Sequence, residues 1–381
     1  MTRARSFVLA AGGTGGHMVP AAALAAELMR RGHRVALVSD ARGVRFPGLF
    51  DGVETHVIPA GRFAGGPVGW AKAARQMVEG RRTARELYRS LKPAAVVGFG
   101  GYPAFPALSA AFAGRIPTAV HEQNAVLGRV NRLVARRVDA IATSYPATER
   151  LKPAYANKVH LVGNPVREAV LSLRSRPYPL LEEDGIFRVL VTGGSQGASV
   201  LSQVVPDGLA MLPVAFRRRL QVTHQARIED IDAAREKYAS LDIAADLATY
   251  LPDMPEQLAW AHLVIARAGA STIAELTAAG RPAILVPLPG ATDDHQTANA
   301  RAITEAGGAR TIPQPRFTPT ELAKQMQKLG LDPAALENAA GRARACGMPD
   351  AVSDMADLVE SLDAPRAPVH VGRVQHKEAF A

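Results

Sequence analysis

Two glycine-rich segments of the chain have the composition of anion-binding turns. Residues 8–16 read Val-Leu-Ala-Ala-Gly-Gly-Thr-Gly-Gly, and residues 189–197 read Val-Leu-Val-Thr-Gly-Gly-Ser-Gln-Gly. Each segment is an apolar run followed by paired glycines, a hydroxyl residue and a further glycine. A strand that ends in such a turn and leads into a helix presents free backbone N–H groups to an anion. The repetition predicts two α/β halves that each offer one such turn to a shared cleft.

Neither turn completes a standard phosphate-binding motif. A dinucleotide motif that uses Gly13 and Gly15 needs a glycine at position 18, which is Met18, and no Gly-Lys-Ser/Thr follows either turn. No pair of acidic residues separated by one residue stands at a strand end to hold a metal–nucleotide complex. We therefore expect helix N-termini and arginine or lysine side chains to neutralise phosphate, without a cofactor or a metal ion.

Candidate catalytic residues stand in the N-terminal half. His17 ends the first turn, where a helix start would hold it at the rim of the cleft as a general base. The alternative for His17 is a capping or loop hydrogen bond. Residues 121–124, His-Glu-Gln-Asn, follow an apolar strand, and ligands of open α/β sheets bind at strand carboxyl ends. Glu122 and Asn124 are thus candidates, with a purely structural polar cluster as the alternative.

Two segments of the C-terminal half have the composition of a nucleotide-sugar site. Residues 267–275, Arg-Ala-Gly-Ala-Ser-Thr-Ile-Ala-Glu, follow an apolar strand, and glycine with hydroxyl residues predicts another helix start. Glu275 lies one turn further in, where a carboxylate can accept both hydroxyls of a ribose. Gln296 and Asn299 follow a proline-rich strand end and fit sugar hydroxyls. Each segment alone fits helix capping, but together they indicate one ligand site.

The elements that position these segments alternate between strand and helix, which implies parallel sheets. We therefore predict an α/β fold with two Rossmann-like domains. The expected strands are 8–11, 34–39, 95–99, 118–121, 140–143 and 159–162, then 188–192, 220–224, 248–251, 263–266 and 283–287; the expected helices are 19–31, one ending near 113, and 350–362. A linker is expected over 172–185, where prolines and an acidic run break the composition.

Length and composition agree with this organisation. A chain of 381 residues is too long for one ordinary core, and 48% hydrophobic with 21% charged residues is typical of a well-packed soluble protein. No apolar run reaches the roughly 18 to 20 residues that span a bilayer. The basic start of the chain resembles a signal peptide, but the short apolar run behind it is read as a first strand. The single Cys346 fits a reducing cytoplasm.

The net charge of +10 calls for an acidic partner: nucleic acid, anionic lipid or a phosphorylated substrate. The segment 72–92 is rich in arginine, and Phe63, Val68 and Trp70 stand just before it. Basic side chains beside exposed apolar ones suit an interfacial membrane site. A solvated helix face next to a flexible loop is the equally open alternative. No nucleic-acid-binding module is recognisable, so we expect no nucleic-acid partner.

The motifs, in this order, resemble those of the MurG-type transferases of peptidoglycan synthesis, which are GT-B glycosyltransferases. The resemblance covers residues 6 to 362 and leaves out the tail. It departs at Ser271, where a leucine is often found, and at His295, where a glutamine is common. The matching strings are residues 12–17, 100–102, 121–124, 163–167, 193–197, 267–275 and 295–299.

The resemblance implies transfer of N-acetylglucosamine (GlcNAc) from UDP-GlcNAc to the 4-hydroxyl of N-acetylmuramic acid (MurNAc) in undecaprenyl-diphospho-MurNAc-pentapeptide, with inversion. It implies that His17, or Glu122 as second choice, is the base, and that Thr14, Gly15 and Gly16 close over the donor and meet the acceptor diphosphate. The other implied substrate contacts are Asn124 and Gln296 to GlcNAc, Arg167 near the nucleotide, Ser195 with Ala270, Ser271 and Thr272 to the diphosphate, Glu275 to ribose and Leu251 to uracil.

The resemblance also implies a division of the chain. Residues 1–168 are expected to form an acceptor- and membrane-facing domain, and residues 169–348 a UDP-GlcNAc-binding domain. A terminal helix over 349–363 is expected to pack back toward the first domain, and 364–381 to be a disordered basic tail. The implied location is the cytoplasmic face of the bacterial inner membrane, with other cell-wall synthesis proteins as possible partners. A UDP-GlcNAc 2-epimerase, a glycolipid synthase or a non-catalytic nucleotide-sugar-binding regulator are the alternatives.

Overall fold

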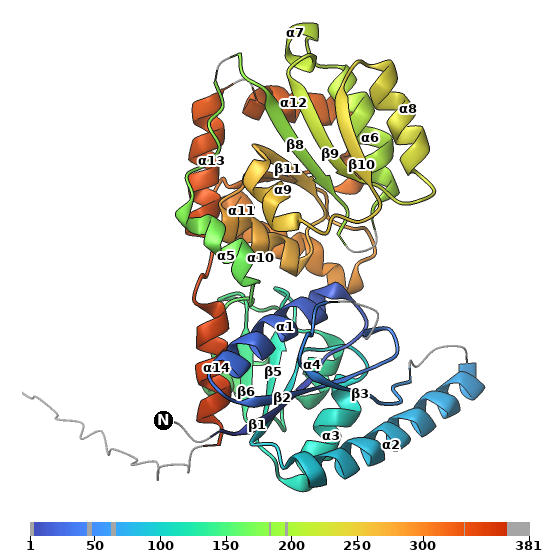
Figure 1. The fold of residues 1–381 in the computed structure, drawn as a ribbon. Coiled ribbons are helices and arrows are strands. Elements are labelled where there is room, and N and C mark those ends of the chain that lie inside the picture. Colours follow the sequence, from blue (N-terminus) through green and yellow to red (C-terminus); the bar gives the residue numbers. More distant parts are fainter. Residues whose placement is uncertain are drawn as a thin grey trace, which may run out of the picture.

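The computed structural model describes residues 4–43, 48–61, 66–182, 184–194, 197–330 and 332–363. Two α/β domains lie one above the other in Figure 1. Within the described ranges, a seven-stranded sheet has the order β3-β2-β1-β4-β5-β6-β7 and a six-stranded sheet has the order β10-β9-β8-β11-β12-β13. The strand pairs of both sheets are parallel. The predicted fold class is confirmed.

The central strands of the N-terminal sheet are buried on both faces because helices cover each side, and these strands are therefore nearly continuous apolar runs. Along β1, Phe7 and Leu9 belong to one buried cluster with α1, whereas Val8 and Ala10 belong to another with α2 and α3. The alternation follows from the two-residue period of a strand. The strands are β1 (Ser6–Ala10), β2 (Arg34–Ser39), β3 (Glu54–Val57), β4 (Ala95–Gly98), β5 (Thr118–Glu122), β6 (Ala140–Thr143) and β7 (Val159–Leu161); the helices are α1 (Gly15–Arg30), α2 (Gly66–Leu91), α3 (Ala104–Gly114) and α4 (Arg129–Val134). Helix α5 (Glu168–Leu171) follows β7 and packs with the C-terminal domain.

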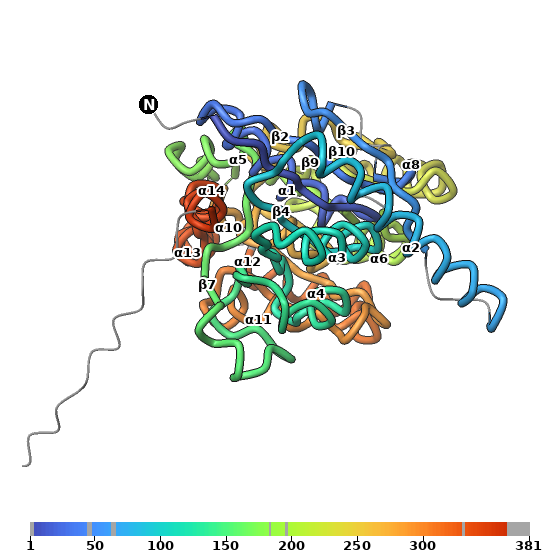
Figure 2. The backbone as a smooth tube through the Cα atoms, turned by 90° about the horizontal axis from the view of Figure 1, so that it is seen from below, coloured from blue at the N-terminus to red at the C-terminus, as the bar shows by residue number. Residues whose placement is uncertain are grey.

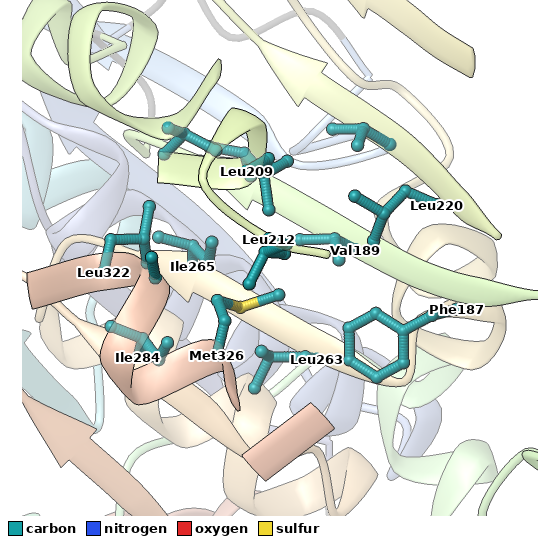
Figure 3. Packing of buried hydrophobic residues seen from close by; sticks show 14 of the residues in the cluster. Phe187, Val189, Leu209, Leu212, Leu220, Leu263, Ile265, Ile284, Leu322 and Met326 are labelled. Carbon is teal, nitrogen blue, oxygen red and sulfur yellow. The ribbon is translucent and has the colours of Figure 1, made fainter. Parts of the chain in front are cut away.

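The C-terminal domain repeats this plan. Figure 3 shows its central core, in which Val189, Leu263 and Ile265 of the sheet pack against Leu209, Leu322 and Met326 of the covering helices. Its strands are β8 (Phe187–Thr192), β9 (Leu220–Gln225), β10 (Ala244–Ala248), β11 (Leu263–Ala266), β12 (Ala283–Leu285) and β13 (Ala309–Thr311); its helices are α6 (Ser199–Ala210), α7 (Val214–Arg217), α8 (Ile231–Ser240), α9 (Met254–Trp260), α10 (Ala270–Ala279), α11 (His295–Glu305), α12 (Pro319–Gly330) and α13 (Pro333–Ala345).

The predicted elements fail mainly at the sheet edges. Strands over 34–39, 140–143 and 263–266 have the predicted bounds. The prediction of a strand over 248–251 is wrong, because β10 ends at Ala248 and the apolar pattern beyond it continues into a loop. Edge strands β3 and β13 were not predicted. Most residues of β3 are exposed, so the strand lacks the apolar signature that burial imposes on central strands.

The chain crosses twice between the domains. After β7 it enters the C-terminal domain, and α14 (Ala351–Ser361) returns to pack against α1. A Cβ atom at Gly163 would lie 2.8 Å from the Cβ of Met348, so the two crossings touch. Arg31 of the α1 C-cap pairs with Glu360 of α14 at 2.6 Å. The predicted tail over 364–381 lies outside the described residues.

Helix α2 projects from the N-terminal domain in both Figure 1 and Figure 2. Its 26 residues bury Ala73, Gly80, Ala84 and Tyr88, mainly toward α3. A Cβ atom at Gly80 would lie 2.1 Å from the carbonyl oxygen of Pro59, so only glycine permits this approach. Within the described residues, we find no helix that combines the length and the apolar character needed to cross a membrane.

Candidate functional site

Two glycine loops of the N-terminal domain interlock at the ends of β1 and β4. A Cβ atom at Gly101, whose φ is +76°, would lie 2.5 Å from the carbonyl oxygen of Gly12. A Cβ atom at Gly12 would lie 2.6 Å from Cγ of Pro103. The turn that follows β1 therefore rests directly on the loop that follows β4. Helix α1 starts at once after this turn, and its N-cap Thr14 makes no side-chain capping hydrogen bond.

His17 lies in the first turn of α1, with its ring against Gly100. Its Nδ1 is 3.0 Å from the carbonyl oxygen of Gly12. A carbonyl only accepts, so Nδ1 carries the proton and the neutral ring leaves a lone pair on Nε2. Burial lowers the pKa of His17, against the hydrogen bond to Gly12 and the charge of Glu122, which raise it. The side chain is thus held as a neutral imidazole, the form that a general base requires.

The carboxylate of Glu122, at the end of β5, accepts hydrogen bonds from residues that follow it in the chain. Its carboxylate accepts hydrogen bonds from the backbone N–H of Asn124 and Gly128 and from the side chains of Asn124 and Asn131, at 2.7 to 3.1 Å. The residue is only 2% exposed. These four donors occupy the carboxylate, so the arrangement suits a residue that shapes the loop over residues 122–131 better than a proton acceptor.

His121 and Gln123 form the structural part of the same polar cluster. Gln123 donates to Nδ1 of His121 at 3.0 Å, and Nε2 of His121 donates to the carbonyl of Gly163 at 2.9 Å. Burial lowers the pKa of His121 to about 4. The structural alternative therefore fits these two side chains, which tie β5 to the segment that crosses between the domains.

Asn124 and Asn299 meet across the domain boundary. Nδ2 of Asn299 donates to Oδ1 of Asn124 at 3.0 Å and to the carbonyl of Ala268 at 3.3 Å, while Oδ1 of Asn299 accepts from the N–H of Ala125 at 2.7 Å. Both amide hydrogens of Asn299 are therefore used within the protein. The predicted contact of Asn299 with sugar hydroxyls stays a prediction, and the structure gives it a role between the domains.

Gln296 lies in the first turn of α11 beside the start of α10. Its Oε1 accepts from the backbone N–H of Leu288 at 2.9 Å and of Ala268 at 3.2 Å. These bonds fix the side chain and direct its carbonyl at the protein. The NH2 group of Gln296 is the part of its side chain that could donate a hydrogen bond to a ligand oxygen.

Arg167 and Glu275 form an ion pair between α5 and α10. Nη2 of Arg167, at the N-cap of α5, lies 3.0 Å from Oε1 of Glu275 in α10. Burial raises the pKa of Glu275, and the neighbouring Arg167 opposes that shift. The Nε of Arg167 is buried without a hydrogen-bond partner. The predicted nucleotide contact of Arg167 and the predicted ribose contact of Glu275 thus fall on one ion pair.

The N-terminus of α10 is a candidate anion site of the C-terminal domain. Its N-cap Gly269 makes no side-chain cap, and the Oγ of Ser271 is buried without a partner. Ala270, Ser271 and Thr272 form its first turn. Arg267, by contrast, donates to the carbonyls of Val286 and Pro287 and to Gln314, so its buried guanidinium is used by the fold.

The glycine turn after β8 is closed on itself. A Cβ atom at Gly193 would lie 2.3 Å from the carbonyl carbon of Gly197, and Gly194 and Gly197 have positive φ. Ser195, the predicted diphosphate ligand in this turn, lies outside the described residues. Leu251 is 8% exposed and packs in the cluster that includes Leu190 and Val264. Its predicted contact with uracil stays a prediction.

Sequence reasoning missed an ion pair beside the first glycine turn and an ion cluster between the domains. Asp40, after β2, accepts from Nε and Nη2 of Arg42, and a Cβ atom at Gly13 would lie 3.9 Å from that Nη2. The position of Asp40 and Arg42 after a strand was an available signal. Asp293 pairs with Arg132 and Arg150 of the other domain. No local pattern links residues so far apart in the chain.

No group of three or more His, Cys, Asp or Glu side chains in the described part of the chain is arranged to hold a metal ion. The starts of α1 and α10 have no side-chain capping hydrogen bond. Arg42 lies beside the turn that precedes α1, and Arg167 pairs with Glu275 of α10.

Comparison with known proteins agrees with this arrangement. The chain matches the Glycosyltransferase family 28 N-terminal domain over residues 7–143 and the Glycosyltransferase family 28 C-terminal domain over residues 188–357. The crystal structure of Acinetobacter baumannii MurG is similar, with a TM-score of 0.75 and 29% identity, over 94% of this chain and 100% of that one. A putative UDP-N-acetylglucosamine 2-epimerase from Listeria monocytogenes shares the fold, with a TM-score of 0.66, over 94% of this chain and 96% of that one, but only 15% identity.

Curated relatives share far more of the sequence. A protein of Zymomonas mobilis is 62% identical over 362 residues, which cover 95% of this chain and 94% of that protein. A protein of Erythrobacter litoralis is 64% identical over 358 residues, which cover 94% of this chain and 90% of that protein. Both are named UDP-N-acetylglucosamine--N-acetylmuramyl-(pentapeptide) pyrophosphoryl-undecaprenol N-acetylglucosamine transferase. The chain has two parallel-sheet domains, a His17 ring held in its neutral form, and this degree of identity to both proteins. It therefore belongs to that family of GT-B glycosyltransferases.

Proposed function

We propose that this protein transfers N-acetylglucosamine from UDP-GlcNAc to the 4-hydroxyl of MurNAc in undecaprenyl-diphospho-MurNAc-pentapeptide, with inversion at the anomeric carbon. This step converts lipid I to lipid II in peptidoglycan synthesis and would serve cell-wall growth, cell shape and division. The names of relatives that are 62% and 64% identical over nearly the whole chain support the reaction. The neutral ring of His17 is the structural observation that carries the proposal furthest.

In this proposal Nε2 of His17 accepts the proton of the acceptor hydroxyl as that oxygen attacks the anomeric carbon. The hydrogen bond from Nδ1 to Gly12 sets the tautomer, and Gly100 leaves room for the ring. Glu122 acts on the same reaction by shaping the loop that carries Asn124. His17 is therefore preferred over Glu122 as the base, in the order that the sequence suggested.

The donor is proposed to lie against the C-terminal domain. Glu275 accepts the ribose hydroxyls, Leu251 faces uracil, and Ser195 with Ala270, Ser271 and Thr272 holds the diphosphate. Asn124 and the amide of Gln296 contact the sugar from opposite domains. Negative charge develops on the leaving UDP, and the uncapped start of α10 stabilises such charge without a metal. Thr14, Gly15 and Gly16 offer the start of α1 to the diphosphate of the acceptor.

The acceptor is a membrane lipid, so we also propose peripheral binding to the anionic cytoplasmic face of the inner membrane through α2. Val68 and Trp70 are 82% and 57% exposed on this projecting helix. Its exposed basic residues, Lys72, Arg75, Arg81, Arg82, Arg85 and Arg89, outnumber its exposed acidic residues, Glu79 and Glu86. Apolar side chains next to basic ones suit the headgroup region of an anionic bilayer. Phe63, the third apolar residue of this predicted site, lies outside the described residues. Other cell-wall synthesis proteins are also proposed as partners.

The test is a transfer assay with radiolabelled UDP-GlcNAc and a short-chain analogue of the lipid acceptor, with and without EDTA. The proposal expects a labelled disaccharide-lipid, equimolar UDP and the same rate in EDTA. Conversion of UDP-GlcNAc to its 2-epimer without acceptor would instead indicate an epimerase. Donor binding without UDP release would indicate a regulator. Activity that EDTA abolishes and Mg²⁺ restores would contradict the metal-free mechanism.

A further inference from the structure

Asp293 forms the centre of an ion cluster between the domains. Its Oδ2 lies 2.6 Å from Nη2 of Arg132 in α4, and its Oδ1 lies 2.9 Å from Nη1 of Arg150. The Asp293 side chain is 14% exposed, and those of Arg132 and Arg150 are 25% and 52% exposed. The pair of Asp293 with Arg132 is therefore screened less by solvent and salt than a surface pair. The cluster therefore holds one domain against the other.

The backbone that carries Asp293 is unusual. Asp293 and Asp294 both have left-handed conformations, with φ of 58° and 51°. Arg150, the partner of Asp293, has φ of 62°. Such conformations are rare outside glycine and need support from the surrounding structure. For Asp293 that support comes from the other domain, whereas the carboxylate of Asp294 accepts from Thr297 within the same segment.

The same cluster frames the proposed sugar contacts. Asp293 lies three residues before Gln296. Asn299 lies three residues after Gln296 and forms hydrogen bonds with Asn124 and Ala125. Arg132 directly follows Asn131, whose side chain bonds Glu122 under the Asn124 loop. Ala298 of α11 packs against Ala125 and Val126 at this contact. Gln296 thus lies close to the C-terminal side of this interdomain contact, and Asn124 lies close to its N-terminal side.

The geometry points to Asp293 as a positioning residue that holds Gln296 and Asn124 at the spacing needed to grip the donor sugar from both domains. The inference rests on the proposed function for the identity of the donor. The proposed uridine contacts, Glu275 and Leu251, lie in the C-terminal domain alone. Loss of the ion cluster therefore lowers the efficiency of transfer from UDP-GlcNAc, whereas the affinity for UDP itself is retained.

The first test compares Asp293→Asn with Asp294→Asn. Both variants remove one carboxylate charge, and asparagine tolerates the left-handed backbone. For Asp293→Asn we expect kcat/KM for UDP-GlcNAc to fall by about tenfold, with a Kd for UDP within about twofold of the unmodified protein. Asp294→Asn should leave both values unchanged. Unchanged kcat/KM in Asp293→Asn, or an equal loss of UDP affinity, overturns the inference.

A second readout does not depend on activity. The N–H of Ala125 is bonded to Asn299 across the boundary, so hydrogen exchange in a peptide that covers residues 124–128 should be faster in Asp293→Asn than in Asp294→Asn. Equal exchange in the two variants contradicts the inference even if no transfer is observed. If the unmodified protein shows no transfer while the exchange result holds, the proposed function fails and the interdomain role of Asp293 stands.

A double-mutant cycle tests the pairing directly. Asp293→Asn and Arg132→Gln should each lower kcat/KM, and the double variant should lose less than the product of the two effects, because both remove one interaction. Fully multiplicative losses would show that Asp293 and Arg132 act separately and would overturn the inference.

Discussion

Nδ1 of His17 lies 3.0 Å from the carbonyl oxygen of Gly12, five residues earlier in the same turn. This one contact joins the fold to the proposed chemistry. The turn places its own carbonyl where it fixes the tautomer of the ring, and Gly100 of the neighbouring loop allows the ring to lie there. A glycine-rich loop that was predicted for anion binding thus also orients the proposed base.

Replacement of His17 by alanine should lower kcat by about 100-fold or more, the usual scale of general base catalysis, with little change in KM for the donor. His160→Ala, an exposed histidine on β7, is the control and should have no effect. The pKa of His17 lies below its ordinary value of 6.5, so the basic form persists as the pH falls through 6.5. The acid limb of kcat/KM should therefore lie below pH 6.5, and a limb centred above it would contradict the assignment.

Glu122→Gln tests whether the carboxylate is structural. An amide in this place would turn one N–H group toward the N–H donors that now bond Glu122. We expect a loss of about 2–3 kcal/mol in the free energy of unfolding, since buried donors lose their acceptor. Urea denaturation measures it. Glu86→Gln, an exposed partner of Arg82, should change stability by less than about 0.5 kcal/mol. Full stability with lost transfer would instead restore Glu122 as a base candidate.

Glu275→Gln should weaken UDP binding by about tenfold, since hydrogen bonds to a charged acceptor are stronger than those to an amide. Titration calorimetry with UDP and with 2′-deoxy-UDP separates the ribose contact: the variant and the unmodified protein should differ less for the deoxy compound. Burial raises the pKa of Glu275 above 4.5, so UDP affinity should fall as the pH is lowered toward that raised value. An equal loss for both ligands would refute the ribose contact.

Three buried histidines predict the acid limit of stability. Burial lowers the pKa of His121, His224 and His262 to about 4, compared with 6.5 in the unfolded chain. Between these values the unfolded state binds more protons, so stability is complete above pH 6.5 and is lost as the pH falls toward 4. The melting temperature should therefore drop steadily across this window. A flat profile from pH 6.5 to 4 would contradict the burial of these rings.

Trp70→Ser should reduce association with liposomes that contain anionic phospholipid, by about threefold or more if the side chain enters the interface. Val214→Ser is a matched control, because Val214 is 54% exposed on α7 of the other domain, far from α2 in Figure 1. Co-sedimentation measures both variants. Equal binding of the two would favour the interpretation of α2 as a solvated helix.

Elements of the fold were predictable from the sequence where the segment itself carries a clear apolar or turn pattern. Central strands such as β2, β6 and β11 had the predicted bounds because burial on both faces forces an apolar run. The polar edge strand β3 carries no such signature. Helix α1 begins at Gly15, four residues before its predicted start, because contacts of the turn with residues 100–103 compensate for two glycines that are poor helix formers.

By itself the sequence determined the two strand–turn–helix repeats, the parallel α/β plan and the group of segments that bear polar chemistry, because each depends on residues adjacent in the chain. The tertiary structure decided which of those polar groups still have donors or acceptors free to bind a ligand. It engages Glu122 with four donors and Asn299 with the opposite domain, and it pairs Asp293 with two distant arginines. Hydrogen-bond saturation and ion pairing depend on what lies within about 3 Å in space, and residues more than a hundred positions apart meet only once the chain has folded.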